Sequence, residues 1–342
     1  MSDATLPTPP FPPAPGVPPS GPIFPMSFGQ ILDRIFRLVR SNWKPFLGIG
    51  LLPIGTLVVI EGSFFGLLFL AGAFRRPPAQ PNMAALAWVG IPFLLLFLPA
   101  MFLMYGLYYG ASSYAGLEAD HGRAPTAGAS LRHAWSRIGR YVWLMVLRSL
   151  IVAIPIVVLA LAVGLGAALL GLASKGNPDP ATLFFLIPLV ILFYLGAIVY
   201  AILMSLRLSL AFPACIQEGL TATQAIKRSG VLTQGAKGRI FLMLMVIYAI
   251  SYAAVLVMYA VGLFIFAIAA LAGAANFQHM TPLGYAVMGL LALCALVLVL
   301  LWSALLMAAY SIAFAVFYRD QRLRQEGPPP APAQAAPVPE EG

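Results

Sequence analysis

Charged residues are scarce in this sequence: Asp, Glu, Lys and Arg make up 9% of its 342 residues, whereas 61% are hydrophobic. A soluble domain carries about 25% charged residues, because charged side chains cover the surface that water contacts. This composition therefore excludes a water-soluble enzyme, and an integral membrane protein is the class that fits.

Cysteine and histidine are rare as well, with two cysteines and three histidines in the chain. Cys215 and Cys294 lie 79 residues apart and no CxxC spacing occurs, so neither a disulfide framework nor a zinc site is indicated. No GxxxxGK[ST] or GxGxxG sequence precedes a helix, so nothing indicates a nucleotide cofactor. We expect no cofactor, no metal, no catalytic residue and no enzyme activity.

Proline is concentrated in the two tails, with ten prolines in residues 1–25 and six in residues 327–342. These tails hold too little apolar surface to offset the conformational entropy that is lost on ordering, and we expect both to be disordered. Residues 26–326 form the predicted membrane domain.

Long apolar runs fill that domain, and each exceeds the roughly 20 residues that a helix needs to cross a bilayer. They predict an all-α fold, a polytopic bundle of six transmembrane helices. Prolines inside the runs are predicted kink points: Pro53, Pro92, Pro99, Pro155 and Pro188. The six runs cover about 46–74, 84–117, 141–173, 182–213, 240–273 and 283–317.

The net charge of +9 has a topological explanation, so we expect no nucleic-acid partner. Seventeen Lys and Arg residues fall on one side of the six runs, and Arg75, Arg76 and Lys175 fall on the other. Basic residues collect on the cytoplasmic side of membrane proteins. We therefore predict that both termini are cytoplasmic and that loops 75–83, 174–181 and 274–282 face outward.

Three basic segments, 27–41, 130–140 and 221–235, each precede a pair of apolar runs and show a helical apolar face. Ser27 with Gln30, and Thr221 with Gln224, fit capping boxes, and Gly235 fits a helix end. The sequence thus predicts three units, each an amphipathic helix followed by a transmembrane hairpin. In these units Arg34, His133 and Arg228 recur at spacings of 99 and 95 residues.

The basic faces of these segments are candidate contacts for lipid headgroups, because amphipathic helices lie in the membrane interface with Lys and Arg toward the headgroups. The other interpretation is that they are connector helices whose basic residues are only solvated. Membrane lipids, anionic ones in particular, are the expected partners, and protein partners cannot be named. The candidate contacts are Arg34, Arg37, Arg40, Arg132, Arg137, Arg140, Lys227 and Arg228.

Glu61 is a candidate intramembrane polar site, because it lies well inside the first apolar run. A charge there costs about 2.5–3.5 kcal/mol on insertion scales, so it is usually paired, buried or protonated. Glu61 is either a proton or substrate site or a structural group bonded to a Ser, Thr, Tyr or Gln of another helix. Two small-residue pairs, Gly62 with Gly66 and Gly106 with Gly110, predict close helix packing.

Three segments follow one another in an order typical of one family: 26–53 (MSFGQILDRIFRLVRSNWKPFLGIGLLP), 207–235 (RLSLAFPACIQEGLTATQAIKRSGVLTQG) and 317–327 (FYRDQRLRQEG). Together they resemble the bacterial membrane-domain family named after glycerophosphoryl diester phosphodiesterase. The resemblance implies a membrane architecture in the bacterial inner membrane. Some members of that family carry a fused phosphodiesterase domain, whereas others stand alone.

Phosphodiesterase chemistry is not expected here, because such hydrolases hold a divalent metal with a histidine pair and several carboxylates. His279 is predicted outside while His121 and His133 are predicted inside, and the Glu118, Asp120 and His121 cluster fits a solvated loop. We expect a non-enzymatic structural or lipid-interacting membrane protein that organises partners. The alternative is a transporter or channel-like protein that uses Glu61, and an accessory role in glycerophosphodiester metabolism ranks last.

Overall fold

The computed structural model describes residues 24–71, 83–173, 180–269 and 282–327, which form nine helices and no strand. Nearly all of the two tails and of the three predicted outward loops lie outside these ranges, together with Arg75, Arg76, Lys175 and His279. The helices are α1 (Phe28–Leu70), α2 (Met83–Asp120), α3 (Ala127–Ser136), α4 (Ile138–Ala173), α5 (Pro180–Arg207), α6 (Ala211–Gln217), α7 (Ala222–Leu232), α8 (Lys237–Ala269) and α9 (Pro282–Glu326).

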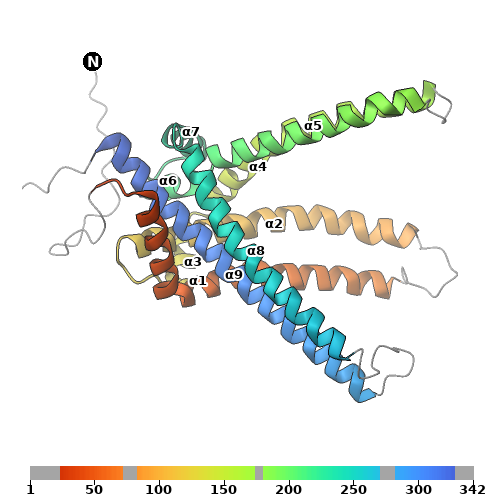
Figure 1. Cartoon of the computed structure of the whole chain (residues 1–342), viewed down its shortest axis with the longest axis horizontal. Coiled ribbons are helices and arrows are strands. Elements are labelled where there is room, and N and C mark those ends of the chain that lie inside the picture. The colour runs from red at the N-terminus through yellow and green to blue at the C-terminus, as the bar shows by residue number, and fades with distance from the viewer. Residues whose placement is uncertain (1–23, 72–82, 174–179, 270–281, 328–342) are drawn as a thin grey trace, which may run out of the picture.

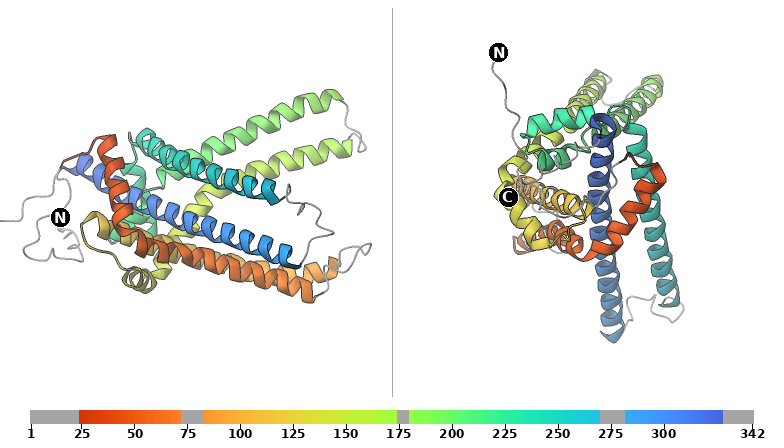
Figure 2. Two further views of the ribbon diagram at one scale, coloured as in Figure 1. Left: turned by 60° about the horizontal axis from the view of Figure 1, so that its bottom comes forward. Right: turned by 90° about the vertical axis from the view of Figure 1, so that its left-hand side faces the viewer.

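Six of these helices, α1, α2, α4, α5, α8 and α9, are long and apolar enough to cross a membrane. This confirms the predicted all-α bundle and makes the chain a multi-pass membrane protein. In Figure 1, α1 with α2, α4 with α5, and α8 with α9 form three pairs that leave a common end and then diverge. In the left view of Figure 2, α9 runs alongside α1 and α2, whereas α4 and α5 extend away from them.

The first amphipathic segment is continuous with the first spanning helix, because α1 begins at a capping box and then bends. The Ser27 hydroxyl accepts from the Gln30 backbone N–H, and the Gln30 side chain accepts from the Ser27 N–H, as predicted. The non-helical torsion angles fall at Asn42, three residues before Pro45, and not at Pro53. Pro45 has no N–H to donate, and the Asn42 side-chain amide donates to the Leu38 carbonyl at this bend.

The second and third amphipathic segments are separate short helices whose bounds differ from the predicted ones. The predicted segment 130–140 is divided between α3 and α4, because Arg137 has non-helical torsion angles and α4 begins at Ile138. The Gln224 side chain accepts from the Thr221 N–H at the start of α7, and Gly235 has a φ of +74°, a conformation that glycine adopts without strain. The short helix α6 was not predicted, and the threefold repeat remains a prediction.

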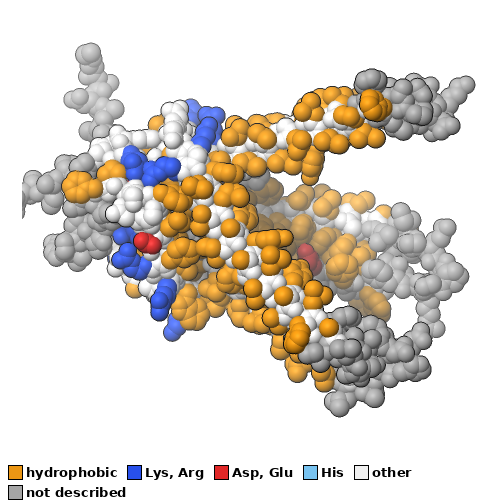
Figure 3. Space-filling view, viewed as in Figure 1, with side chains coloured by type: hydrophobic (Ala, Val, Ile, Leu, Met, Phe, Trp, Pro, Cys, Tyr) orange, Lys and Arg blue, Asp and Glu red, His pale blue; other side chains and the backbone are white. Residues whose placement is uncertain are grey.

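The buried core lies at the common end of the three pairs, which we call the basic end. The basic end comprises residues 26–49, 108–144 and 206–243 with the last turns of α9, and Lys and Arg side chains gather there in Figure 3. Tyr141, Phe46 and Phe317 are almost completely buried at this end. Away from it the helices expose apolar side chains, and Leu96 and Leu192 have exposed fractions of 74% and 66%. Acyl chains of lipids would cover this surface in a bilayer.

Glycines allow the closest helix contacts near the basic end. A Cβ atom on Gly106 would lie 3.0 Å from the Val142 backbone nitrogen of α4, and one on Gly110 would lie 2.5 Å from the Tyr141 ring. The predicted packing of this pair is therefore confirmed. A Cβ on Gly62 or Gly66 would meet no described atom within 4 Å, so the predicted packing of that pair is wrong for the part of the chain that the structure describes.

Candidate functional site

The last turns of α9, residues 317–326, organise the basic end, and we call them the closing segment. They contact residues from α2, α7 and α8 and the stretch before α1 through ion pairs and hydrogen bonds. Three carboxylates, one of them within the closing segment, form ion pairs with arginines of the basic end.

Asp120 is the first of these carboxylates, and its side chain is 1% exposed at the end of α2. Arg34 of α1 donates from Nε to the Asp120 Oδ1 at 2.6 Å and from Nη2 to the Asp120 carbonyl at 2.7 Å. Arg319 of the closing segment donates to the other carboxylate oxygen at 3.3 Å. One buried carboxylate thus holds α1, α2 and α9 together.

Asp320 is the second carboxylate, and its side chain is completely buried. Its Oδ1 accepts from the Met26 backbone N–H at 2.8 Å, while its Oδ2 accepts from Arg324 at 2.9 Å and from Arg239 of α8 at 3.4 Å. Both arginines also donate to the Met26 carbonyl, at 2.6 Å and 3.2 Å. The backbone just before α1 is thereby fixed to α8 and α9.

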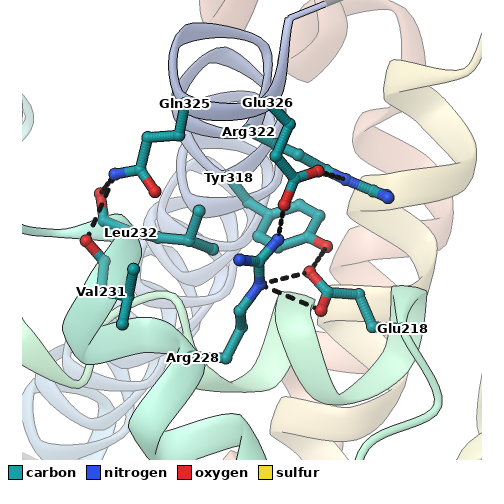
Figure 4. A network of polar contacts seen from close by, with 8 residues as sticks. All are labelled: Glu218, Arg228, Val231, Leu232, Tyr318, Arg322, Gln325 and Glu326. Carbon is teal, nitrogen blue, oxygen red and sulfur yellow. Dashed lines mark hydrogen bonds and ion pairs between the residues drawn. The ribbon is translucent and has the colours of Figure 1, made fainter. Parts of the chain in front are cut away.

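Glu218 is the third carboxylate, and it follows α6 (Figure 4). Arg228 of α7 donates from Nε to both Glu218 oxygens, at 2.9 Å and 3.0 Å, and pairs with Glu326 as well. The Tyr318 hydroxyl donates to the Glu218 Oε1 at 2.6 Å, so α6, α7 and the closing segment share one network. Two further bonds run from the Gln325 side chain to the carbonyls at the end of α7.

Sequence reasoning missed the role of these three carboxylates, because it considered Asp120 only as part of a solvated loop and did not consider Glu218 or Asp320. Asp120, Glu218 and Asp320 recur at spacings of 98 and 102 residues, close to the spacings that were noted for the basic segments. A lone acid at the end of an apolar run is costly unless it is paired, and this was the signal available in the sequence. The expected solvated loop at Glu118–His121 is also wrong, because Asp120 is buried and still belongs to α2.

The eight candidate lipid contacts fall into two groups in the structure. Arg34 and Arg228 are half-buried and paired with carboxylates, so their charges are neutralised within the protein. Arg137 and Arg140 are half-buried, and Arg140 donates to the Gly219 carbonyl at 3.1 Å. The exposed candidates, which form no ion pair with any described residue, are Arg37, Arg40, Arg132 and Lys227.

Glu61 is exposed in the C-terminal half of α1, away from this network. The expected hydrogen-bond partner on another helix is not found among the described residues. An apolar groove of about 170 Å³ lies between α1, α8 and α9, and Glu61 does not line it. Within the described ranges, no three His, Cys, Asp or Glu residues are placed to hold a metal ion.

His133 is half-buried within the basic end. Its ring is stacked on Tyr114 at a centroid distance of 4.1 Å, and its Nε2 lies 3.5 Å from the Tyr141 hydroxyl. Burial and the nearby charge of Arg137 lower the pKa of His133 below its usual 6.5. The folded protein therefore binds a proton at this position less readily than the unfolded chain does.

Acidification should lower the stability of the protein through His133. A group whose pKa is lowered on folding contributes stability that is present above its unfolded pKa and lost as pH falls through the window below it. The midpoint of thermal unfolding in detergent should therefore fall between about pH 7.5 and pH 5.5, where histidine takes up its proton. In His133→Gln this fall should be smaller, with a remainder from His121, whose pKa is lowered by burial and by Arg319. An unchanged pH dependence in His133→Gln would contradict this account.

Comparison with protein-family models, with curated proteins and with solved structures finds no match to this chain. The resemblance of residues 26–53, 207–235 and 317–327 to the membrane-domain family therefore remains a prediction.

Proposed function

We propose that the protein is a non-enzymatic inner-membrane protein that binds anionic lipids at its basic end, which faces the cytoplasm. The observation that carries this proposal is the distribution of charge at that end. Ion pairs engage Glu118, Asp120, Glu218, Asp320 and Glu326, so these acids do not offset the remaining basic residues.

The basic residues outside the ion pairs are distributed over several elements of the basic end. Arg37, Arg40 and Lys44 are exposed on α1, Arg132 on α3, and Lys227 on α7. Asp33 is the exposed acid beside them that has no ion pair within the described residues. Such a surface favours anionic headgroups, and each basic residue near a membrane contributes about 1 kcal/mol to that attraction.

The large apolar surface supports lipids as partners of this end. Beyond the basic end the helix pairs diverge (Figure 1), and side chains such as Val59 and Phe264 are each 67% exposed. A surface of this kind is stable only when hydrocarbon covers it. Lipids that surround the pairs would place their headgroups beside the exposed basic residues of α1, α3 and α7.

The double variant Arg37→Gln/Arg40→Gln tests the proposal. It should weaken the association of phosphatidylglycerol by about 2 kcal/mol, or roughly thirtyfold, without unfolding the bundle. The measurement is the lipid retained by the protein in nanodiscs of mixed phosphatidylglycerol and phosphatidylcholine, quantified by native mass spectrometry.

A matched control is Arg123→Gln/Arg322→Gln, which removes the same charge from the same end. Both of these arginines are exposed but already paired, with Glu118 and with Glu326. Phosphatidylglycerol association should change little in this control. Equal losses in the two double variants, or no preference for phosphatidylglycerol in the wild type, would overturn the proposal.

A further inference from the structure

We propose that the groove between α1, α8 and α9 is a binding site for one acyl chain of an anionic phospholipid, whose phosphate meets Arg37 and Arg40. This inference rests on the proposed lipid function and adds one defined site to it. The occupant follows from the lining, the size, the depth and the charge of the groove.

The lining of the groove is apolar and comes from three elements. Ile35, Phe36 and Val39 of α1 form one wall, while α8 contributes Ile247 and Ile250 and α9 contributes Leu305 and Ala309. Ser251 also lies in the wall, but its hydroxyl already donates to the Ile247 carbonyl at 2.8 Å. Apart from the buried indole N–H of Trp302, the groove therefore offers a saturated chain an apolar surface.

The size of the groove suits part of a chain. Its volume is about 170 Å³, and an apolar cavity of about 150 Å³ holds a molecule of benzene. A whole lipid does not fit, whereas a stretch of several methylene groups does. The rest of the lipid would extend along the exposed surface of the helices.

The depth of the groove agrees with the upper part of an acyl chain. Ile247 lies ten residues after Lys237, the first residue of α8, which is about 15 Å along the helix. The hydrocarbon core is about 30 Å thick, so a site at this distance from the headgroups lies within one leaflet. The amphipathic segment of α1 is one wall of the groove, and that segment itself belongs in the interface.

Two exposed basic residues close to the groove in α1 complement the phosphate of a phospholipid. Arg40 lies one helical turn after Phe36 of the groove wall, Arg37 directly follows Phe36 in the chain, and neither pairs with a described carboxylate. The indole of Trp302 lies in the groove wall, farther from the basic end than Leu305 and Ala309, so its fluorescence reports on the acyl chain of a bound lipid.

Quenching of Trp302 fluorescence by lipids with brominated acyl chains tests the site. The fluorescence of Trp302 is obtained by subtracting the fluorescence of Trp302→Phe from that of the wild type. Both proteins are measured in nanodiscs of phosphatidylcholine with an increasing mole fraction of brominated phosphatidylglycerol. A specific site gives quenching that saturates at a low mole fraction of the brominated lipid. Unspecific contact gives quenching that rises in proportion to that fraction, and this result would overturn the proposal.

Variants distinguish the binding site of the acyl chain from the contacts of the headgroup. Ala309→Phe and Ile250→Phe place a ring in the groove, and each should abolish the saturating component while the protein stays monodisperse. Arg37→Gln/Arg40→Gln should retain quenching but shift its midpoint to a mole fraction at least tenfold higher. Ala295→Phe, on an exposed part of α9, is the matched control and should behave as the wild type.

The outcomes distinguish this inference from the proposed function. Selective retention of phosphatidylglycerol with no saturating component would leave the lipid function standing and overturn the groove. Loss of both signals in the wild type would overturn both. A wild type that is dimeric in nanodiscs and becomes monomeric in Ala309→Phe would assign the groove to a second copy of the chain, and this too would overturn the lipid site.

Discussion

Replacement of Asp320 by Asn should destabilise the folded protein by about 3 kcal/mol, the lower end of the cost of breaking a buried ion pair. The Asp320 side chain is completely buried and accepts from Met26, Arg239 and Arg324. An asparagine keeps the shape but leaves the two guanidinium groups without their counter-charge. The lower end applies because both arginines are about one-third exposed and retain contact with water.

Two measurements check this prediction. The midpoint of thermal unfolding in detergent should fall in Asp320→Asn, and trypsin should cleave more readily at Arg34 and Arg37, because the backbone before α1 has lost its anchor. Arg322→Gln is the control, since its pair with Glu326 is exposed and such pairs contribute about 0.3–0.5 kcal/mol. Unfolding and cleavage profiles that are the same in the two variants would contradict the assigned role of Asp320.

Replacement of Gly106 by Ala should also destabilise the bundle, by about 1–3 kcal/mol. The added Cβ would lie 3.0 Å from the backbone of Val142, and a backbone atom cannot turn away as a flexible side chain can. Helices α2 and α4 must therefore separate at their closest approach. The denaturant midpoint of the purified protein in mixed micelles measures this loss.

The same substitution at Gly62 provides a control, in which the free energy of unfolding should stay the same or rise. No described atom lies within 4 Å of a Cβ at that position, and Ala is favoured over Gly in a helix by about 0.5–1 kcal/mol. Gly62→Ala should therefore be neutral or slightly stabilising. Equal losses at Gly62 and Gly106 would show that the close contact of α2 with α4 is not what limits stability.

The parts of this fold that the sequence predicted are those set by nearby residues. A capping box spans three residues, so Ser27 and Gln30 could be recognised together, and the structure places both bonds there. The six spanning helices follow from apolar length alone. Pro53, inside α1, gave a weaker signal, because the bend lies at Asn42, where Pro45 lacks an N–H and the Asn42 side chain donates to the Leu38 carbonyl.

The candidate site was less predictable, because its partners are distant in the chain. Arg34 and Asp120 are 86 residues apart, and Arg319 and Asp120 are 199 residues apart. Which arginine reaches which carboxylate depends on how the helices pack, and hydrophobic periodicity carries no information on that choice. The exposed Arg37 and the paired Arg34 therefore looked equivalent in the sequence, although only one of them is available to a lipid.

The bonds between Met26 and the closing segment bear on how the protein is made. Asp320 lies 294 residues after the backbone N–H that it accepts from, so the ribosome has synthesised almost the whole chain before that bond can form. Until then Asp120 has Arg34 but not Arg319 as a counter-charge, and Glu218 lacks the hydrogen bond from Tyr318. The first helices thus remain loosely joined in the membrane during synthesis, and a chain that stops before Tyr318 would stay in that state and be open to membrane proteases.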